Sequence, residues 1–179
     1  MAHHKFPFEL FVKEDWSIEH IIPQNPKDIS DVEIYKQWYI DILSFNETDV
    51  YDQIINQLKN YTSIEDINSD KELKSKLDKI VDEFEDTTHK IDNLLLLDRN
   101  TNSALGNLSF KEKRKKILRF DKRGMNDNDK PVFIPIETLN AFNKTFGEKI
   151  NIENWLRTDG DNYRISIAER LADFLPKSN

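Results

Sequence analysis

The stretch from Trp16 to Gln24 (Trp-Ser-Ile-Glu-His-Ile-Ile-Pro-Gln) constrains the fold of this chain more than any other. Its tryptophan and three isoleucines are residue types that fill a half-buried β-strand. Pro23 cannot donate a hydrogen bond to a sheet, so the strand should end or bend there. Glu19 and His20 are adjacent, and neighbours in a regular strand face opposite sides. We therefore expect the strand to distort near its end if both side chains serve one site.

The length and composition of the chain fit one folded domain that covers residues 1–179. Hydrophobic residues make up 37% and aromatic residues 11% of the 179, which is enough for a core and argues against disorder. The sequence has no apolar run long enough to cross a membrane and no hydrophobic leader. It has no cysteine, which excludes disulfides and cysteine-ligated zinc. We therefore expect a cytoplasmic protein.

The charge of the chain is divided between two regions. The formal net charge is −7, which by itself argues against binding to nucleic acid. However, residues 31–88 hold 15 acidic residues against six lysines, whereas residues 99–123 hold nine basic residues against two acids. The local charge therefore says more about partners than the total does.

The acidic region has the pattern of a helical insertion, over about residues 31–88. Apolar residues at helical spacing predict three helices, in residues 30–45, 51–58 and 73–84. Ser30 and Glu33 form a possible capping box for the first helix. A solvated helical layer that packs one face on a core is the simpler interpretation, and a partner-binding insertion is the alternative.

A second group of elements follows the insertion. Residues 91–97 predict a buried strand, and residues 98–103 are rich in side chains that bond to the backbone at turns and caps. Ser109 and Glu112 form a second possible capping box, which predicts a helix from Ser109 to about Phe120. Further on, we expect an extended segment over 132–136, a short helix over 138–146, a turn over 158–161 and a final amphipathic helix over 165–175.

Together these segments resemble the HNH, or His-Me finger, nucleases. The resemblance depends on a strand with Glu-His-Ile-x-Pro, a second strand that opens with Asp92-Asn93, and Asn102 nine residues further at the start of a helical region. A longer set of segments is similar to the HNH domain at the C-terminus of GmrSD-type modification-dependent restriction proteins. That set comprises Trp16–Gln24, Asn93–Leu97, Asn102–Arg114 and Phe133–Thr138, with Phe142 and Lys144.

The resemblance implies an α+β fold that is mostly α. A ββα-metal core would carry the helical insertion between its two finger strands, and further helices would follow at the C-terminus. In the GmrSD-type proteins a nucleotide-hydrolysing domain or subunit normally acts upstream of the HNH domain. This chain has no P-loop or other nucleotide-binding motif. We therefore expect it to be the C-terminal part of a longer protein.

The resemblance also assigns roles to four residues. His20 matches the general base, Glu19 the acidic metal ligand and Asn102 the second metal ligand. Asn93 matches the residue whose side chain orients the histidine. Oxygen ligands suit one Mg²⁺ or Mn²⁺ ion, whose remaining ligands would be water and phosphate. Such an ion stabilises the charge that develops when a phosphodiester is cleaved, and a histidine can take a proton from water at neutral pH.

The basic region is the expected contact surface for DNA. Clustered Lys and Arg side chains neutralise phosphates without reading base sequence. The expected nucleic-acid-binding residues are Arg99, Asn107, Lys111, Arg114, Lys115 and Arg119. The alternative is an ordinary solvated basic helix face.

The sequence thus predicts a metal-dependent DNA endonuclease of restriction and anti-phage defence. Two other classes remain open: a non-catalytic nucleic-acid-binding module built on a decayed HNH fold, and a protein-interaction domain whose acidic helices bind a basic partner. His89 lies just ahead of the second strand, and we assign it a structural role.

Overall fold

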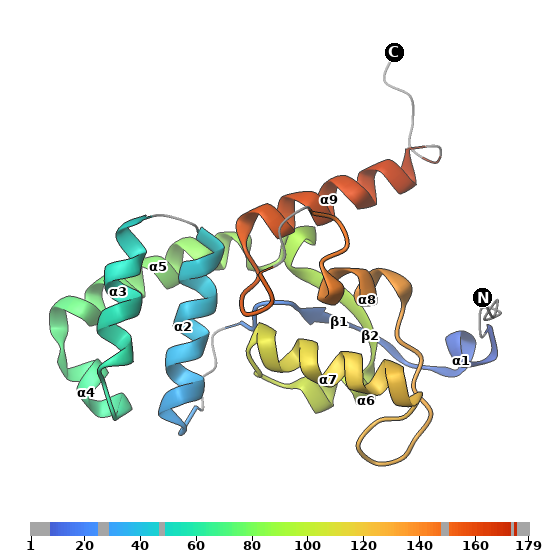
Figure 1. Ribbon diagram of the computed structural model, residues 1–179, viewed down its shortest axis with the longest axis horizontal. Coiled ribbons are helices and arrows are strands. Elements are labelled where there is room, and N and C mark those ends of the chain that lie inside the picture. The colour runs from blue at the N-terminus through green and yellow to red at the C-terminus, as the bar shows by residue number, and fades with distance from the viewer. Residues whose placement is uncertain (1–7, 25–28, 47–48, 148–150, 173, 175–179) are drawn as a thin grey trace.

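The computed structural model describes residues 8–24, 29–46, 49–147, 151–172 and 174, and shows an α+β fold that is mostly helical (Figure 1). The described part has one antiparallel sheet of two strands. In sequence, helices come before the first strand, between the two strands and after the second strand. No described helix is both long and apolar enough to cross a membrane.

The sheet joins the two segments that the sequence predicts as strands. β1 (Trp16–His20) pairs with β2 (Leu94–Asp98) in a register that runs from Trp16 opposite Asp98 to His20 opposite Leu94. The pairing is regular up to His20, so the distortion expected near the end of the strand is not present within it. Residues 91–93, predicted as strand, form a 3-10 turn, η1 (Ile91–Asn93), in which the Asn93 N–H donates to the Lys90 carbonyl at 2.9 Å.

The outer edge of β2 is closed by hydroxyl groups from two later helices. The Thr138 hydroxyl donates to the Leu96 carbonyl at 2.7 Å, and the Tyr163 hydroxyl donates to the Leu94 carbonyl at 3.2 Å. Thr138 lies on α8 (Ile136–Asn143) and Tyr163 on α9 (Arg157–Leu171). A two-stranded ribbon is marginally stable alone and exposes unpaired groups along both edges. Side chains from helices supply those partners here.

Four helices lie between the two strands and form the part of the molecule at the left of Figure 1. They are α2 (Val32–Asn46), α3 (Asp49–Lys59), α4 (Ile64–Ser69) and α5 (Lys71–Thr88). The sequence predicted α2, α3 and α5 but not the short α4. The predicted Ser30 cap is also wrong, since the Asp31 carboxylate accepts from the N–H groups of Glu33 and Ile34.

The helices after β2 follow the prediction in part. α6 (Arg99–Leu105) occupies most of the stretch over 98–103 that was predicted as a turn or cap region, and α7 (Phe110–Arg123) follows it as expected. The Ser109 side chain accepts a hydrogen bond from the Glu112 N–H, as expected for a cap at the start of α7. Before β1, α1 (Phe8–Lys13) forms a short helix that the sequence did not predict.

The last helix differs from its prediction in two ways. α9 begins at Arg157, so the turn expected over 158–161 is helical. A Cβ at position 160 would lie 3.3 Å from side-chain atoms of Asp92 and Phe45, so glycine allows the helix to pack closely there. The apolar face expected from Ile165 onward is not buried, since Ile165 is 50% exposed. The predicted end of this helix, residues 175 and 176, lies outside the described residues.

The insertion is tied to α7 by a buried carboxylate. Asp41 of α2 is fully buried, and its Oδ2 accepts from the Phe110 N–H at 3.0 Å, the first N–H of α7. Gln37 donates to the other oxygen at 3.0 Å. Asp41 therefore caps a helix that lies 69 residues further along the chain. Burial raises the pKa of Asp41 to about 6, against which its two hydrogen bonds and Lys113 act.

This raised pKa predicts a pH-dependent stability that Asp41→Asn should remove. The folded state binds the Asp41 proton more tightly than the unfolded state, so this contribution favours folding at pH 4 and is lost as the pH rises to about 6. Two pKa units correspond to roughly 3 kcal/mol of unfolding free energy. Urea unfolding at pH 4 and pH 7 measures this contribution to the unfolding free energy. Asp52→Asn, at an exposed position of α3, is the matched control, and equal pH profiles for wild type and Asp41→Asn would contradict the prediction.

Candidate active site

The first part of the site is the outer edge of β1, where α6 contributes Asn102. Its Nδ2 donates to the Ser17 hydroxyl at 2.8 Å and to the Ile18 carbonyl at 3.0 Å. The helix starts at this point because the Asp98 carboxylate accepts from the Thr101 N–H at 2.9 Å and caps it. Both Asn102 amide hydrogens are therefore directed at β1, which leaves Oδ1 as the atom that could bind a cation.

The second part is Lys113 of α7, which lies against the same edge of β1. Its ammonium donates to the His20 carbonyl at 2.7 Å and lies 2.5 Å from Glu19 Oε1. The side chain is 1% exposed. Lys113 belongs to the basic region over residues 99–123, which the sequence predicts to be a contact surface for DNA. For this residue the prediction is wrong, because its side chain is buried. Helical spacing contained the signal, because position 113 lies on one face with the buried Phe110 and Ile117.

Glu19 and Lys113 form a buried ion pair. Burial raises the pKa of Glu19, and the Lys113 ammonium opposes that rise. Burial lowers the pKa of Lys113, and the Glu19 carboxylate opposes that change. Each charge thus offsets part of what the other loses on leaving water, and burial remains the larger effect on both pKa values. The candidate acidic ligand is already neutralised by a cation of the protein itself.

His20 faces the other side of β1 from Glu19, as the regular strand requires. Its Nε2 lies 3.2 Å from Nδ1 of His89, and the two rings meet edge to face with centroids 5.2 Å apart. The second ring nitrogen of His89, Nε2, lies 3.2 Å from the Gln24 amide nitrogen. Burial, followed by His89 and Lys113, lowers the pKa of His20, so the imidazole is neutral at pH 7.

His89 is a residue of the site that the sequence analysis placed outside it. It is the C-terminal cap of α5 and so belongs to the end of the insertion. The signal in sequence is its place four residues before Asn93, close to where the chain returns to β1. Gln24 was also missed as an individual residue, although it closes the Trp16–Gln24 motif.

Asn93 joins the ends of the two segments that carry the histidines. Its side chain is fully buried, and its Oδ1 accepts from the Ile22 N–H at 2.8 Å. Its Nδ2 donates to the carbonyls of Ile22 at 3.2 Å and Thr88 at 3.1 Å. Asn93 therefore fixes the backbone two residues after His20 and one residue before His89. These side-chain hydrogen bonds all go to backbone atoms, so Asn93 acts as a backbone clamp rather than through a bond to the imidazole that it was expected to orient.

The oxygen donors available for a metal ion are few. Within the described ranges, no three His, Cys, Asp or Glu side chains gather as a metal-binding group. Glu19 and the amide oxygen of Asn102 are hard donors that suit Mg²⁺ or Mn²⁺ in kind. A cation held there would compete with the Lys113 ammonium for Glu19, and would take its other ligands from water and phosphate.

Most of the predicted DNA-contacting residues are engaged within the chain. Their partners are Asp15 for Arg99, Glu153 for Lys111, the Phe142 carbonyl for Arg114 and Asp127 for Arg119. Asn107 is exposed in the turn after α6. Lys115 is exposed on α7 and forms no ion pair in the part of the chain that the structure describes. The basic surface is therefore weaker than its composition suggests.

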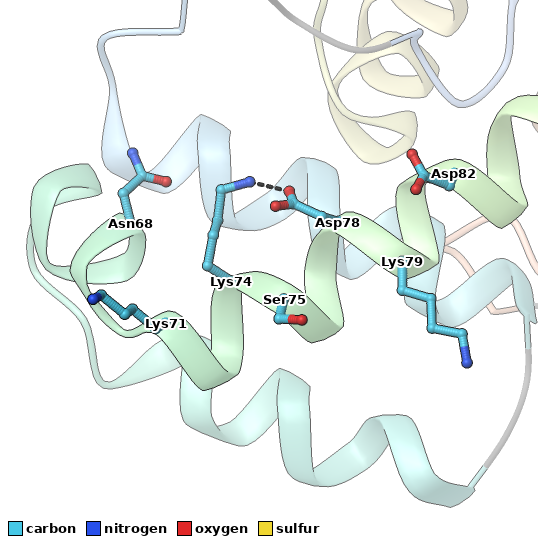
Figure 2. A pocket seen from close by; sticks show the side chains of 7 residues that line it. All are labelled: Asn68, Lys71, Lys74, Ser75, Asp78, Lys79 and Asp82. Carbon is cyan, nitrogen blue, oxygen red and sulfur yellow. Dashed lines mark hydrogen bonds and ion pairs between the residues drawn. The ribbon is translucent and has the colours of Figure 1, made fainter.

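Another pocket lies away from these residues, on α4 and α5 of the insertion (Figure 2). Its volume is about 470 Å³, and its charged lining consists of Lys71, Lys74, Lys79, Asp78 and Asp82, with Lys74 paired to Asp78. Such a lining has little net charge and contains no histidine. A smaller cavity of about 340 Å³ adjoins the site, with Gln24 and His89 in its wall and Trp38 and Phe84 behind them.

A comparison with known families identifies the family of the chain. The model of the family described as GmrSD restriction endonucleases, C-terminal domain, matches residues 41–132, just over half of the chain. The chain belongs to this family. As a GmrSD C-terminal domain it is a nuclease of the restriction-endonuclease type. The matched range contains Asn93, Asn102 and Lys113 but begins after Glu19 and His20. No curated protein and no solved structure matches the chain.

The buried ion pair of this GmrSD C-terminal domain predicts the effect of Lys113→Met. The substitution leaves the Glu19 charge buried without its partner, and breaking such a pair costs about 3–5 kcal/mol of unfolding free energy. Adding Glu19→Gln should restore much of that loss. Urea unfolding of the single and the double variant measures the loss of unfolding free energy and its recovery. Lys115→Met, on the exposed face of α7, is the control. A loss below about 1 kcal/mol in the single variant would show that the pair does not hold α7 to β1.

Proposed function

We propose that this chain is a metal-dependent endonuclease that hydrolyses DNA phosphodiester bonds and acts in restriction and anti-phage defence. The observation that carries the proposal is the position of the Asn102 amide at the edge of β1. It brings Asn102, on the helix that follows the second strand, to Ser17 and to the Ile18 carbonyl, next to Glu19. The family of the chain supports the same class of reaction.

His20 is the general base in this proposal, which requires the end of β1 to distort when substrate binds, because the His20 and Glu19 side chains face opposite sides of the regular strand. Its imidazole is half-buried, its lowered pKa keeps it neutral at pH 7, and its Nε2 is occupied by His89. Nδ1 is then the nitrogen that takes the proton of the attacking water. Lys113 holds the carbonyl of His20 itself and Asn93 holds the backbone of Ile22, which limits the movement of the ring.

Glu19 and Asn102 would hold the metal ion, through a carboxylate oxygen and Oδ1. When bound, a divalent ion there stabilises the negative charge on the phosphate and on the leaving oxygen. Two protein ligands, one of them paired with Lys113, favour weak binding in the absence of DNA. The substrate phosphate would complete the set of ligands.

A decayed site is the second candidate, and the Glu19–Lys113 pair favours it. A carboxylate neutralised by a buried ammonium contributes no net charge toward a divalent ion. A chain with such a site would bind DNA without cleaving it, and binding would not change when EDTA removes divalent ions.

Cleavage of supercoiled plasmid with Mg²⁺ or Mn²⁺ tests the endonuclease. We expect nicking that EDTA abolishes and that His20→Ala slows by roughly 10²–10⁴-fold, the usual contribution of a general base. Lys90→Ala, at an exposed position near His89, should cut as the wild type does. Equal nicking by wild type and His20→Ala would overturn the proposal, and EDTA-insensitive binding without nicking would support the decayed site instead.

DNA binding at α7 should depend mainly on Lys115 and Lys122, its exposed lysines that form no ion pair in the described part of the chain. Lys115→Ala should reduce the slope of log K against log salt by about 1, because one phosphate contact is lost. Fluorescence anisotropy over a salt series measures the slope. Lys79→Ala, on the acidic insertion, is the matched lysine control. If both variants leave the slope unchanged, DNA does not contact this face of α7.

A further inference from the structure

The geometry points to the loop after α7, residues 124–131, as an internal competitor for DNA phosphates (Figure 1). Its two aspartates, Asp127 and Asp129, occupy a stripe of cations on α7 that would otherwise bind the DNA backbone. The inference rests on the proposed function, because it takes DNA as the partner of α7. It goes beyond that function by naming a further phosphate-binding surface and the segment of the chain that covers it.

The covered cations lie along one side of α7. Lys116, Arg119 and Arg123 follow one another at intervals of three and four residues, which places them on one stripe of a helix. The stripe meets α6 at one end, where the Lys116 ammonium donates to the Ala104 carbonyl at 2.8 Å. Ala104 lies two residues after Asn102, the candidate metal ligand. The stripe therefore leads along α7 from the neighbourhood of the candidate site, as contacts to successive phosphates would.

Each cation of the stripe has a carboxylate partner from the loop. Asp127 pairs with Arg119 and lies 3.4 Å from the Lys116 ammonium. Asp129 lies 2.8 Å from the Arg123 guanidinium. Carboxylate and phosphate oxygens accept from the same N–H groups of lysine and arginine, so one anion excludes the other. The loop thus fills the positions that phosphates would take.

The loop is shaped by its own hydrogen bonds. The buried Asn126 side chain accepts from the N–H groups of Asn128 at 2.9 Å and Lys130 at 3.1 Å. Asp129 adopts a left-handed backbone with a φ of 54°, a conformation that aspartate and asparagine tolerate better than most residues. The two carboxylates are therefore held in place before they pair, and less entropy is lost when they do.

DNA can displace these carboxylates because it offers many phosphates at once. Exposed ion pairs are individually weak, whereas cations that bind DNA also release its condensed counterions, which favours the exchange at low salt. In the free protein the loop neutralises the stripe and leaves the exposed lysines of α7 that form no ion pair in the described part of the chain for the first contact. The loop therefore lowers the affinity for DNA without abolishing it.

Fluorescence anisotropy with a labelled DNA duplex in EDTA tests this competition without cleavage. Asp127→Asn frees two cations and should tighten binding by roughly fivefold, because each exposed ion pair is worth a factor of about 1.5 to 5. The slope of log K against log salt should become steeper by about 1 to 2, because up to two more cations contact phosphate. The double variant Asp127→Asn/Asp129→Asn should extend both changes.

Two further variants separate ion pairing from general charge repulsion. Asp121→Asn removes the same charge from α7 itself, where Asp121 is exposed and forms no ion pair with another described residue. It should change the affinity by less than about twofold and leave the slope as in the wild type. Asn126→Ala keeps the charge of the protein but removes the bonds that shape the loop, and should also tighten binding.

The possible failures are distinct. The inference is overturned if Asp127→Asn binds as the wild type does, or if Asp121→Asn has the same effect as Asp127→Asn. It is also overturned if Asn126→Ala does not tighten binding. If neither the wild type nor Asp127→Asn binds the duplex, the inference and the choice of DNA as substrate fail together. If His20→Ala nicks as the wild type does while Asp127→Asn binds more tightly, only the proposed function fails.

Discussion

The buried ammonium of Lys113 is the interaction on which the rest of the site depends. It bonds to the His20 carbonyl and to the Glu19 carboxylate, and it is almost completely removed from water. A buried charge costs several kcal/mol unless it is paired and hydrogen-bonded, so α7 cannot move away from β1 without losing both partners. Asp41 caps the same helix from the insertion. The strand, the helix and the insertion are thus fixed relative to each other by charged groups that tolerate little displacement.

Two of the four side chains that complete the small sheet belong to the candidate site. Asn102 and Lys113 satisfy carbonyls on the outer edge of β1, as Thr138 and Tyr163 do on β2. The ribbon has only two strands, so it needs these partners for stability. A substitution at Asn102 or Lys113 therefore changes the sheet and the chemistry together. A loss of activity at either position has to be compared with stability before it is read as a catalytic effect.

Local pattern was enough to predict the elements that depend on local interactions. β1, most of β2, the start of α7 and three helices of the insertion follow from alternation, helical spacing and capping residues. The errors arose where a distant contact decides the conformation. Residues 158–161 look like a turn because they contain Gly160, but that glycine packs against Asp92 and Phe45 inside α9. The motif identified Glu19, His20, Asn93 and Asn102 as candidates, but it could not reveal the Lys113 ion pair, because an ion pair across 94 residues leaves no local pattern.

The two strands can lie far apart in sequence because Asn93 holds their ends together. A compact finger can bring its strands together through a short hairpin, whereas here α2 to α5 intervene. Asn93 replaces the constraint of a short connection, because it bonds at once to the backbone beyond β1 and to the last residue of α5. The insertion therefore ends where the site begins, and its final residue, His89, contacts His20. A shorter loop could join the strands, but it would remove His89 from His20 and Asp41 from the start of α7. The insertion is thus part of the construction of the site, whatever its acidic outer surface binds.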